Sequence, residues 1–275
     1  MHLLQQNYLL YFSMPFTISH TVLAPVLSRI TGRHLPIAAL AIGCMVPDLF
    51  RLFTAANDHS THLWSGMLHP NLWIGLGFSA LWYLIYRPVL YQVFSLSDPL
   101  RIHNFKNFLR FVFSISVAIL LGNITHLLWD SVTHVDYRTW AFRDLLSHHI
   151  QIFHQTYPLH YLLQIGSSVL ALPILIWMVG HYYQQHHKPT ATARWIRAYF
   201  ALLVVMSLIY AACSCWHYIQ LISTALWQQH AYYFLGRSIN IFMQGWLIVM
   251  TMGCLLLLFL EGKSSPDQQV RNKTP

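Results

Sequence analysis

The chain has 275 residues, of which 16 are Lys or Arg and only 8 are Asp or Glu. Charged residues make up 9% of it and hydrophobic residues 56%, whereas about 25% of an ordinary soluble domain is charged. A soluble globule of this size needs more charge to keep its surface wetted, so the composition excludes a soluble enzyme, a disordered chain and a nucleic-acid-binding module. The formal net charge of +8 comes from basic residues spread along the chain, which is typical of membrane topology signals.

In chain order, residues 1–13 precede Met14 and are interpreted as an extension or a misassigned start. The apolar run 35–53 is interrupted by Gly43 and Pro47, so we expect a helix ending at Pro47 or a re-entrant piece. A spanning helix needs about 20 mostly apolar residues, and five stretches meet that need: 71–91, 108–129, 162–183, 199–222 and 239–260. The sequence therefore predicts an all-α integral membrane helical bundle: one domain over 14–260 with about five transmembrane helices, an N-terminal interfacial or re-entrant helical segment, and a disordered tail at 261–275.

Lys and Arg are unevenly distributed among the segments that separate these stretches. Ten of the 16 lie in 87–110, in 184–197 and in the tail, whereas five of the eight acids lie in the other segments. The positive-inside rule then places the tail in the cytoplasm, and the N-terminal region and loop 130–161 on the outer face.

The end of the second stretch, 108–129, leads into a group of residues that could bind a metal ion. His126, Asp130 and His134 follow an i, i+4, i+8 pattern, so all three lie near one face of a helix. Imidazole and carboxylate are ligands for zinc, manganese or iron. The end-to-end separation of about 12 Å suits His126 and Asp130 on one ion, with His134 on a second ion that Asp130 could bridge. An ordinary polar helix end at the membrane boundary explains the spacing equally well.

Other polar residues are predicted on the same side of the membrane. Asp48 follows an apolar run with no adjacent basic residue, where a carboxylate is costly unless it is paired or bound to a cation; capping of the next helix is the alternative. His20 precedes a helical stretch, and His62 lies in a short polar loop, where most histidines are simply solvated. Because the topology gathers all of these near one interface, we predict a shared site formed by His20, Asp48, His62, His126, Asp130 and His134.

Four stretches resemble a family of bacterial multi-pass membrane proteins of unknown function. The chain reads Met14-Pro-Phe-Thr-Ile-Ser-His20 and then Gly43-Cys-Met-Val-Pro-Asp48, which is similar to the opening of that family. His126-Leu-Leu-Trp-Asp130-Ser-Val-Thr-His134 is similar to its central motif, and Tyr161-Leu-Leu-Gln164-Ile-Gly-Ser-Ser168 to the stretch that follows. The resemblance covers 14–172 and implies a bacterial inner (cytoplasmic) membrane protein with its site on the periplasmic face.

The pattern is more distantly similar to inner-membrane metal-dependent hydrolases and to the zinc-dependent group of phospholipases C and nucleases. That resemblance implies that the same six residues bind a divalent metal, most plausibly zinc. His134 follows Asp130 more closely than in the soluble enzymes, and the ligands of their next helix have no clear match, so one or two ions are expected. Ser19, Asn123 and Thr133 would orient the ligands.

These observations together favour a membrane-bound metal-dependent hydrolase, acting on a phosphoester in a lipid or lipid-linked substrate. Asp48 and Asp130 are its candidate catalytic residues, bridging the metals or positioning water. The lipid bilayer is the expected partner, with no nucleic acid, and the sequence does not indicate an oligomeric state. The alternative is a non-enzymatic transporter, metal-binding protein or assembly factor that uses the same cluster structurally.

Overall fold

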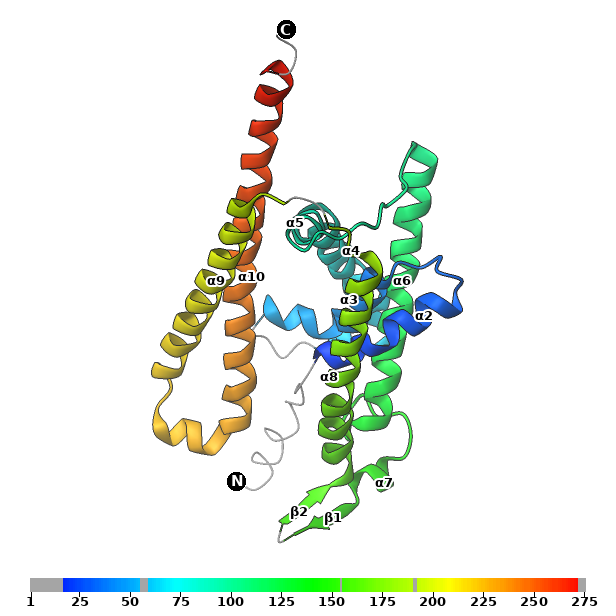
Figure 1. The fold of residues 1–275 in the computed structure, drawn as a ribbon. Coiled ribbons are helices and arrows are strands. Elements are labelled where there is room, and N and C mark those ends of the chain that lie inside the picture. The colour runs from blue at the N-terminus through cyan, green and yellow to red at the C-terminus, as the bar shows by residue number, and fades with distance from the viewer. Residues whose placement is uncertain (1–16, 55–58, 154, 190–191, 272–275) are drawn as a thin grey trace. The chain divides into compact units, whose positions relative to one another are not determined.

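The computed structural model describes residues 17–54, 59–153, 155–189 and 192–271, and it is mostly helical (Figure 1). The extension predicted for residues 1–13 lies outside the described residues. The first elements, in chain order, are η1 (Thr17–Leu23), α2 (Ala24–Ile30), α3 (Ile37–Leu49), η2 (Phe50–Leu52), η3 (Ser60–His62), η4 (Trp64–Gly66), η5 (Met67–Asn71), α4 (Leu72–Leu81), η6 (Trp82–Tyr86) and α5 (Arg87–Val93). They are followed by α6 (Phe105–Thr133), α7 (Arg143–Ser147), β1 (His149–Ile152), β2 (Gln155–Pro158), α8 (Leu159–His186), α9 (Arg194–Gln220) and α10 (Thr224–Arg271).

Four helices are long and apolar enough to cross a membrane, which indicates an integral membrane protein. They are α6, α8, α9 and the part of α10 at Tyr233–Gly262, and they confirm four of the five predicted stretches. The fifth stretch, 71–91, is helical but is divided among η5, α4, η6 and α5, because η5 and η6 adopt π-helical hydrogen bonding. Hydropathy predicted its helical character correctly but not this division.

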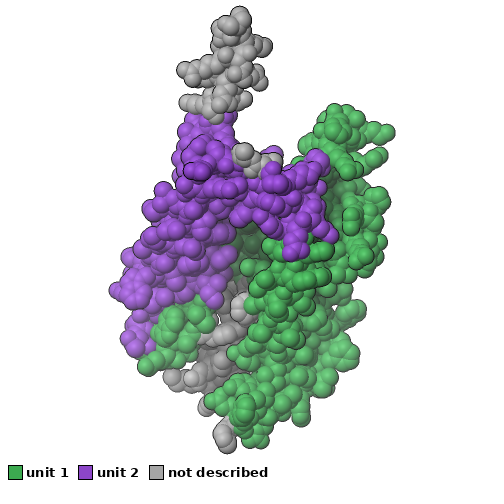
Figure 2. All heavy atoms as spheres, in the orientation of Figure 1, with its two compact units in different colours: residues 1–79, 100–181, 225–236 green, residues 80–99, 182–224, 237–275 purple. Residues whose placement is uncertain are grey.

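The chain divides into two compact units, coloured separately in Figure 2. Unit 1 comprises Met1–Ser79, Leu100–His181 and Ala225–Gly236, and unit 2 comprises Ala80–Pro99, Tyr182–Thr224 and Arg237–Pro275. The sequence predicts a single domain over 14–260, and that remains a prediction. α10 continues to Arg271, through part of the segment predicted to be a disordered tail.

In unit 1, α3 packs closely against α6 because two glycines lie at their contact. A Cβ at Gly43 would collide with the backbone of Ile119, and a Cβ at Gly122 would collide with the backbone of Leu40 and Cys44. α3 continues to Leu49, two residues beyond the predicted end at Pro47. This close approach brings the C-terminal end of α3 beside the last turns of α6, and η1 and α2 pack against α3.

Between α6 and α8, unit 1 carries a loop, the short helix α7 and an antiparallel hairpin. The two strands pair from His149 opposite Pro158 to Ile152 opposite Gln155, and the hairpin leads directly into α8 (Figure 1). The Gln164 amide on α8 donates to the Thr133 carbonyl at the end of α6 (2.6 Å), so α8 satisfies one of the carbonyls that a helix end leaves without a partner.

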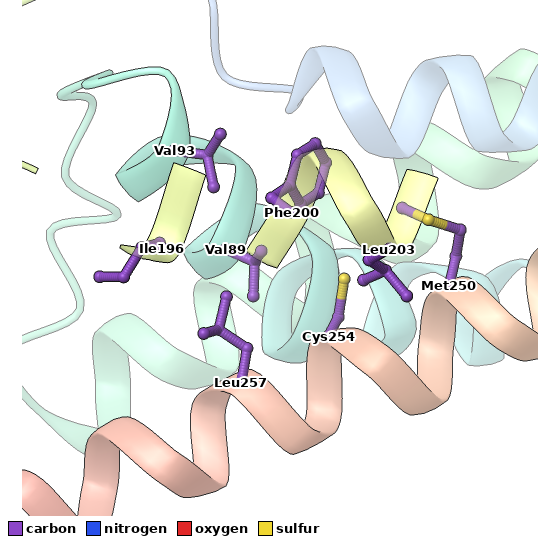
Figure 3. Close-up of a cluster of buried hydrophobic side chains, with 8 residues drawn as sticks. All are labelled: Val89, Val93, Ile196, Phe200, Leu203, Met250, Cys254 and Leu257. Atoms are coloured by element: carbon purple, nitrogen blue, oxygen red, sulfur yellow. The ribbon is translucent and has the colours of Figure 1, made fainter. Parts of the chain in front are cut away.

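Unit 2 has an aliphatic core built from three helices. It consists of Val89 and Val93 of α5, Ile196, Phe200 and Leu203 of α9, and Met250, Cys254 and Leu257 of α10 (Figure 3). Polar contacts lie beside this core, including the Tyr86 hydroxyl, which lies 2.7 Å from the Thr251 hydroxyl. Unit 2 is therefore held together mainly by apolar packing.

Candidate metal centre

The six residues predicted to form a site all lie in unit 1, and four elements position them. η1 carries His20, the end of α3 carries Asp48, η3 carries His62, and α6 carries His126 and Asp130; His134 directly follows α6. His20 is partly exposed, and the other five are buried, with exposed fractions between 1% for His126 and 7% for Asp48. Residues that are far apart in the sequence thus share one interior region of a single unit.

Two overlapping sets of these residues have the spacing needed to hold a metal ion. One set is His20, Asp48 and His126, and the other is His62, His126 and Asp130. Within each set, the ligand atoms lie within 4.8 Å of one another. His134 belongs to neither set, although its Nδ1 lies 3.6 Å from Asp130 Oδ1.

The ring of His126 is oriented by the backbone of α3. Its Nδ1 lies 2.7 Å from the Cys44 carbonyl oxygen, which can only accept, so Nδ1 carries a proton and donates it. The lone pair of a neutral ring is then on Nε2, which lies 3.4 Å from Asp130 Oδ2 and 4.0 Å from Asp48 Oδ1. No hydrogen-bond partner for this buried Nε2 occurs in the described part of the chain.

The ring of His62 is oriented in the same way by a threonine. The Thr61 hydroxyl donates to the Pro47 carbonyl (3.0 Å) and therefore accepts from His62 Nδ1 (3.2 Å). His62 Nε2 then faces Asp48 Oδ1 at 3.0 Å and Asp130 Oδ2 at 3.9 Å. A lone pair that faces a carboxylate is favourable only with a proton or a metal ion between them.

His134 repeats this arrangement. The Thr133 hydroxyl donates to the Trp129 carbonyl (2.8 Å) and accepts from His134 Nδ1 (3.2 Å), which also lies 3.2 Å from the Asp130 carbonyl oxygen. Its Nε2 is buried, with no hydrogen-bond partner among the residues described. In all three rings, therefore, Nδ1 is the donor and Nε2 is left for another group, which is the arrangement of metal-binding histidines.

Burial favours the neutral form of two rings of the site, those of His20 and His62. It lowers the pKa of His20 to about 4 and that of His62 to about 4, because burial disfavours the charged imidazolium. The neutral imidazole is the form that binds a metal. For Asp48, burial alone would raise the pKa, but His126 and His62 lower it below its usual range, so this carboxylate is ionised.

One buried residue of the site, Arg138, was not predicted as a site residue from the sequence. Its Nη1 donates to Asp130 Oδ2 (3.0 Å), and its Nε donates to Asp136 Oδ1 (3.0 Å). Only 5% of its side chain is exposed. In the sequence Arg138 looks like any other loop charge, because no pattern in 134–138 shows that the loop returns its guanidinium to the helix end.

Of the three groups predicted to orient the ligands, Thr133 holds His134 as described. The Ser19 hydroxyl donates to the Ser168 hydroxyl on α8 (3.4 Å). Asn123 is fully buried, and neither polar atom of its side chain has a hydrogen-bond partner within the described ranges. Thr61 is the orienting group that sequence reasoning missed; its signal is that a Thr-His pair occurs at both 61–62 and 133–134.

These features define a multi-pass membrane protein with a buried cluster of imidazoles and carboxylates that could hold a metal ion. The chain belongs to the family described as a domain of unknown function, DUF4184, whose model matches residues 14–257. The match confirms the resemblance to a family of unknown function and extends it beyond residue 172 to the last two spans. A search of curated proteins and a search of solved structures found no match.

Proposed function

We propose that this protein is a membrane-bound, metal-dependent hydrolase that cleaves a phosphoester in a lipid or lipid-linked molecule. The observation that carries the proposal is the shared orientation of His62, His126 and His134, in which Nδ1 lies within hydrogen-bond distance of a protein oxygen and Nε2 is left for another group. Two of these Nε2 atoms face the buried carboxylates Asp48 and Asp130. Each contact is favourable only with a proton or a cation between the nitrogen and the carboxylate, and a bound metal ion would serve both.

The spacing of the ligand atoms fits zinc. Two ligands of a tetrahedral zinc ion, each about 2.0–2.2 Å from the metal, lie about 3.4 Å apart. His126 Nε2 and Asp130 Oδ2 are 3.4 Å apart, and His62 Nε2 and Asp48 Oδ1 are 3.0 Å apart. Imidazole with carboxylate is also the donor set of catalytic zinc sites, so His20, Asp48, His62, His126 and Asp130 are the residues proposed to hold the ion.

The position of the cluster along α6 supports a substrate from the membrane surface. α6 has 29 residues and is about 43 Å long, whereas the hydrocarbon core of a bilayer is about 30 Å thick. His126 lies seven residues before the end of α6, about 10 Å along the helix. It is therefore expected close to the boundary where the phosphates of lipids lie.

A divalent cation bound here would polarise the phosphoryl oxygen and lower the pKa of a bound water. In the reaction, the water oxygen bonds to phosphorus, the ester P–O bond breaks, and the water proton passes to the departing alkoxide. Asp48 is the better-placed proton acceptor, because Arg138 already donates to Asp130 Oδ2. The Thr17 hydroxyl donates to Asp48 Oδ2 (2.9 Å) and orients that carboxylate.

A second candidate function is a structural metal site in a non-enzymatic membrane protein. The observation that favours it is burial: His62 and Asp130 are each 3% exposed. A structural site is closed by protein ligands, whereas a catalytic site keeps a position for water or substrate.

The test begins with elemental analysis of the detergent-purified protein and of two variants, His126→Ala and the control His34→Ala. His34 is an exposed histidine of the same unit. We expect bound zinc in the wild type and in the control, and none in His126→Ala. A wild-type protein that carries no divalent metal would refute the proposal.

Turnover then separates the two candidates. Bis(p-nitrophenyl) phosphate and a fluorescent phospholipid in mixed micelles serve as probes. The Asp48→Asn variant keeps an acceptor for Thr17 but loses the negative charge, so we expect it to lose turnover while it remains folded. A zinc-loaded wild type that hydrolyses neither probe would favour the structural site.

A further inference from the structure

We infer that the guanidinium of Arg138 takes the place of a second metal ion, so that the candidate metal centre holds a single divalent cation. The inference rests on the proposed function and specifies it, because one ion and one fixed organic cation would then face the substrate. It also decides between the one and two ions that the sequence leaves open.

The first argument is that the two ligand sets cannot be filled at the same time. Both sets include His126. Its Nδ1 is committed to the Cys44 carbonyl, so only Nε2 can bind a metal, and one imidazole nitrogen binds one ion. The two sets are therefore two descriptions of one position.

A permanent cation is already bound to Asp130. Arg138 Nη1 lies 3.0 Å from Asp130 Oδ2, the oxygen that also faces His126 Nε2 at 3.4 Å, and its Nε and Nη2 contact the carboxylate of Asp136. A guanidinium that holds two carboxylates together supplies the positive charge that a second, carboxylate-bridged ion would supply. Arginine stays protonated in proteins, so this charge is permanent.

The third argument is the balance of buried charge. Asp48, Asp130 and Asp136 bring three negative charges, and Arg138 brings one positive charge, with at most 11% of any of these side chains exposed. Two negative charges remain when the imidazoles are neutral, which one divalent cation neutralises and two would reverse. Arg51 also acts on Asp48, but it is half-exposed and solvent screens its charge.

The residues around Arg138 show what a second ion would bind if the guanidinium were removed. They are the carboxylates of Asp130 and Asp136, which the guanidinium joins. Carboxylate oxygens bind divalent metal ions, and water can complete the set of ligands. Removal of Arg138 is thus expected to create a second site.

The first experiment counts metal ions in the detergent-purified full-length protein. After dialysis against zinc, elemental analysis is expected to give one equivalent, and a cobalt-loaded sample is expected to show the electron paramagnetic resonance of isolated ions. Two equivalents, with magnetically coupled cobalt, would overturn the inference and leave the proposed hydrolase intact. No bound metal would overturn both, so the two failures are distinguishable.

The second experiment changes the cation itself. Arg138→Ser is expected to raise the zinc content from one equivalent to two, whereas Arg138→Lys, which keeps the charge, and Arg143→Gln, an exposed control from the same loop, are expected to stay at one. An Arg138→Ser protein that folds and holds one ion would contradict the inference. If that variant does not fold, the wild-type count decides, together with Arg138→Lys, in which two equivalents would also contradict it.

Discussion

Unit 1 and unit 2 are both helical, but they bury different chemistry. Unit 1 buries Asp48, His62, His126 and Asp130, together with buried hydroxyls and amides that include Thr61, Asn71, Asn123 and Gln164. The apolar cluster of unit 2 consists of aliphatic, aromatic and sulfur-containing side chains, and the buried polar side chains of that unit, among the described residues, are the serines Ser95, Ser207 and Ser238. Since a buried charge is costly unless it is paired, unit 1 is expected to depend on its partners and on a cation, and unit 2 on the fit of its side chains.

The difference shows where function is expected in this chain. A core such as that of unit 2 needs no ligand to be stable. In unit 1, His126 and His134 instead have buried Nε2 atoms for which the described residues supply no hydrogen-bond partner, which lowers stability unless another group is bound. Four changes test this contrast, starting with the largest expected effect.

The largest effect is expected for Arg138→Gln in chelator-treated protein. The variant leaves the buried carboxylates of Asp130 and Asp136 without their counter-charge, and breaking a buried ion pair costs about 3–5 kcal/mol. Denaturant titration should show this loss in the free energy of unfolding, and Arg143→Gln, which is exposed, should show almost none. Equal losses of unfolding free energy in the two variants would show that unit 1 does not depend on the charge that Arg138 supplies.

In unit 2, Leu257→Ala should lower the free energy of unfolding by about 2–5 kcal/mol, the cost of a cavity in a packed core. Leu257 is fully buried in the apolar cluster. Because no ligand of the candidate site lies in unit 2, zinc content should be unchanged. A loss of zinc in this variant would show that the two units do not keep separate roles.

A smaller effect is expected where α3 meets α6. Gly122→Ala places a methyl group against the backbone of α3. The resulting overpacking should lower the free energy of unfolding by about 1–3 kcal/mol. It should also weaken zinc binding, because α3 carries Asp48. Gly77→Ala is the matched control: no atom lies within 4 Å of its Cβ position, so a gain of up to about 1 kcal/mol in helix propensity is expected. Zinc titration and denaturant titration measure the two effects.

The most gradual effect is expected with pH. The pKa of His20 and that of His62 lie at about 4 in the folded protein, below the ordinary value of 6.5. As pH falls, the unfolded chain therefore takes up protons before the folded protein does. The free energy of unfolding is expected to be highest above about pH 6.5 and to decrease as pH falls toward 4. Unfolding of metal-free protein at several pH values should show the slope, and His62→Gln should reduce it.

Much of the candidate site follows from helix geometry and from the cost of burying charge. The spacing of His126 and Asp130 predicted that both lie on one face of a helix, and the unpaired Asp48 indicated a buried partner. Helix periodicity relates residues along one helix only, so it could not show that Arg138 returns to Asp130, nor that Thr61 links His62 to Pro47. Those contacts depend on the paths of loops.

The fold shows a similar limit. Hydropathy predicted α6, α8, α9 and most of the apolar part of α10, because the bilayer requires long apolar helices. It did not predict the division of 71–91, since average hydropathy does not depend on which carbonyl each amide donates to. π-Helical segments such as η6 change that hydrogen-bond register without changing composition.

The paired threonines affect the proton balance when an ion enters the site. Metal uptake usually expels protons, because thiols and protonated imidazoles must lose theirs first. Here the Thr61 hydroxyl keeps the proton of His62 on Nδ1, and Asp48 is already ionised. At neutral pH, therefore, neither His62 nor Asp48 has to lose a proton before it binds an arriving ion.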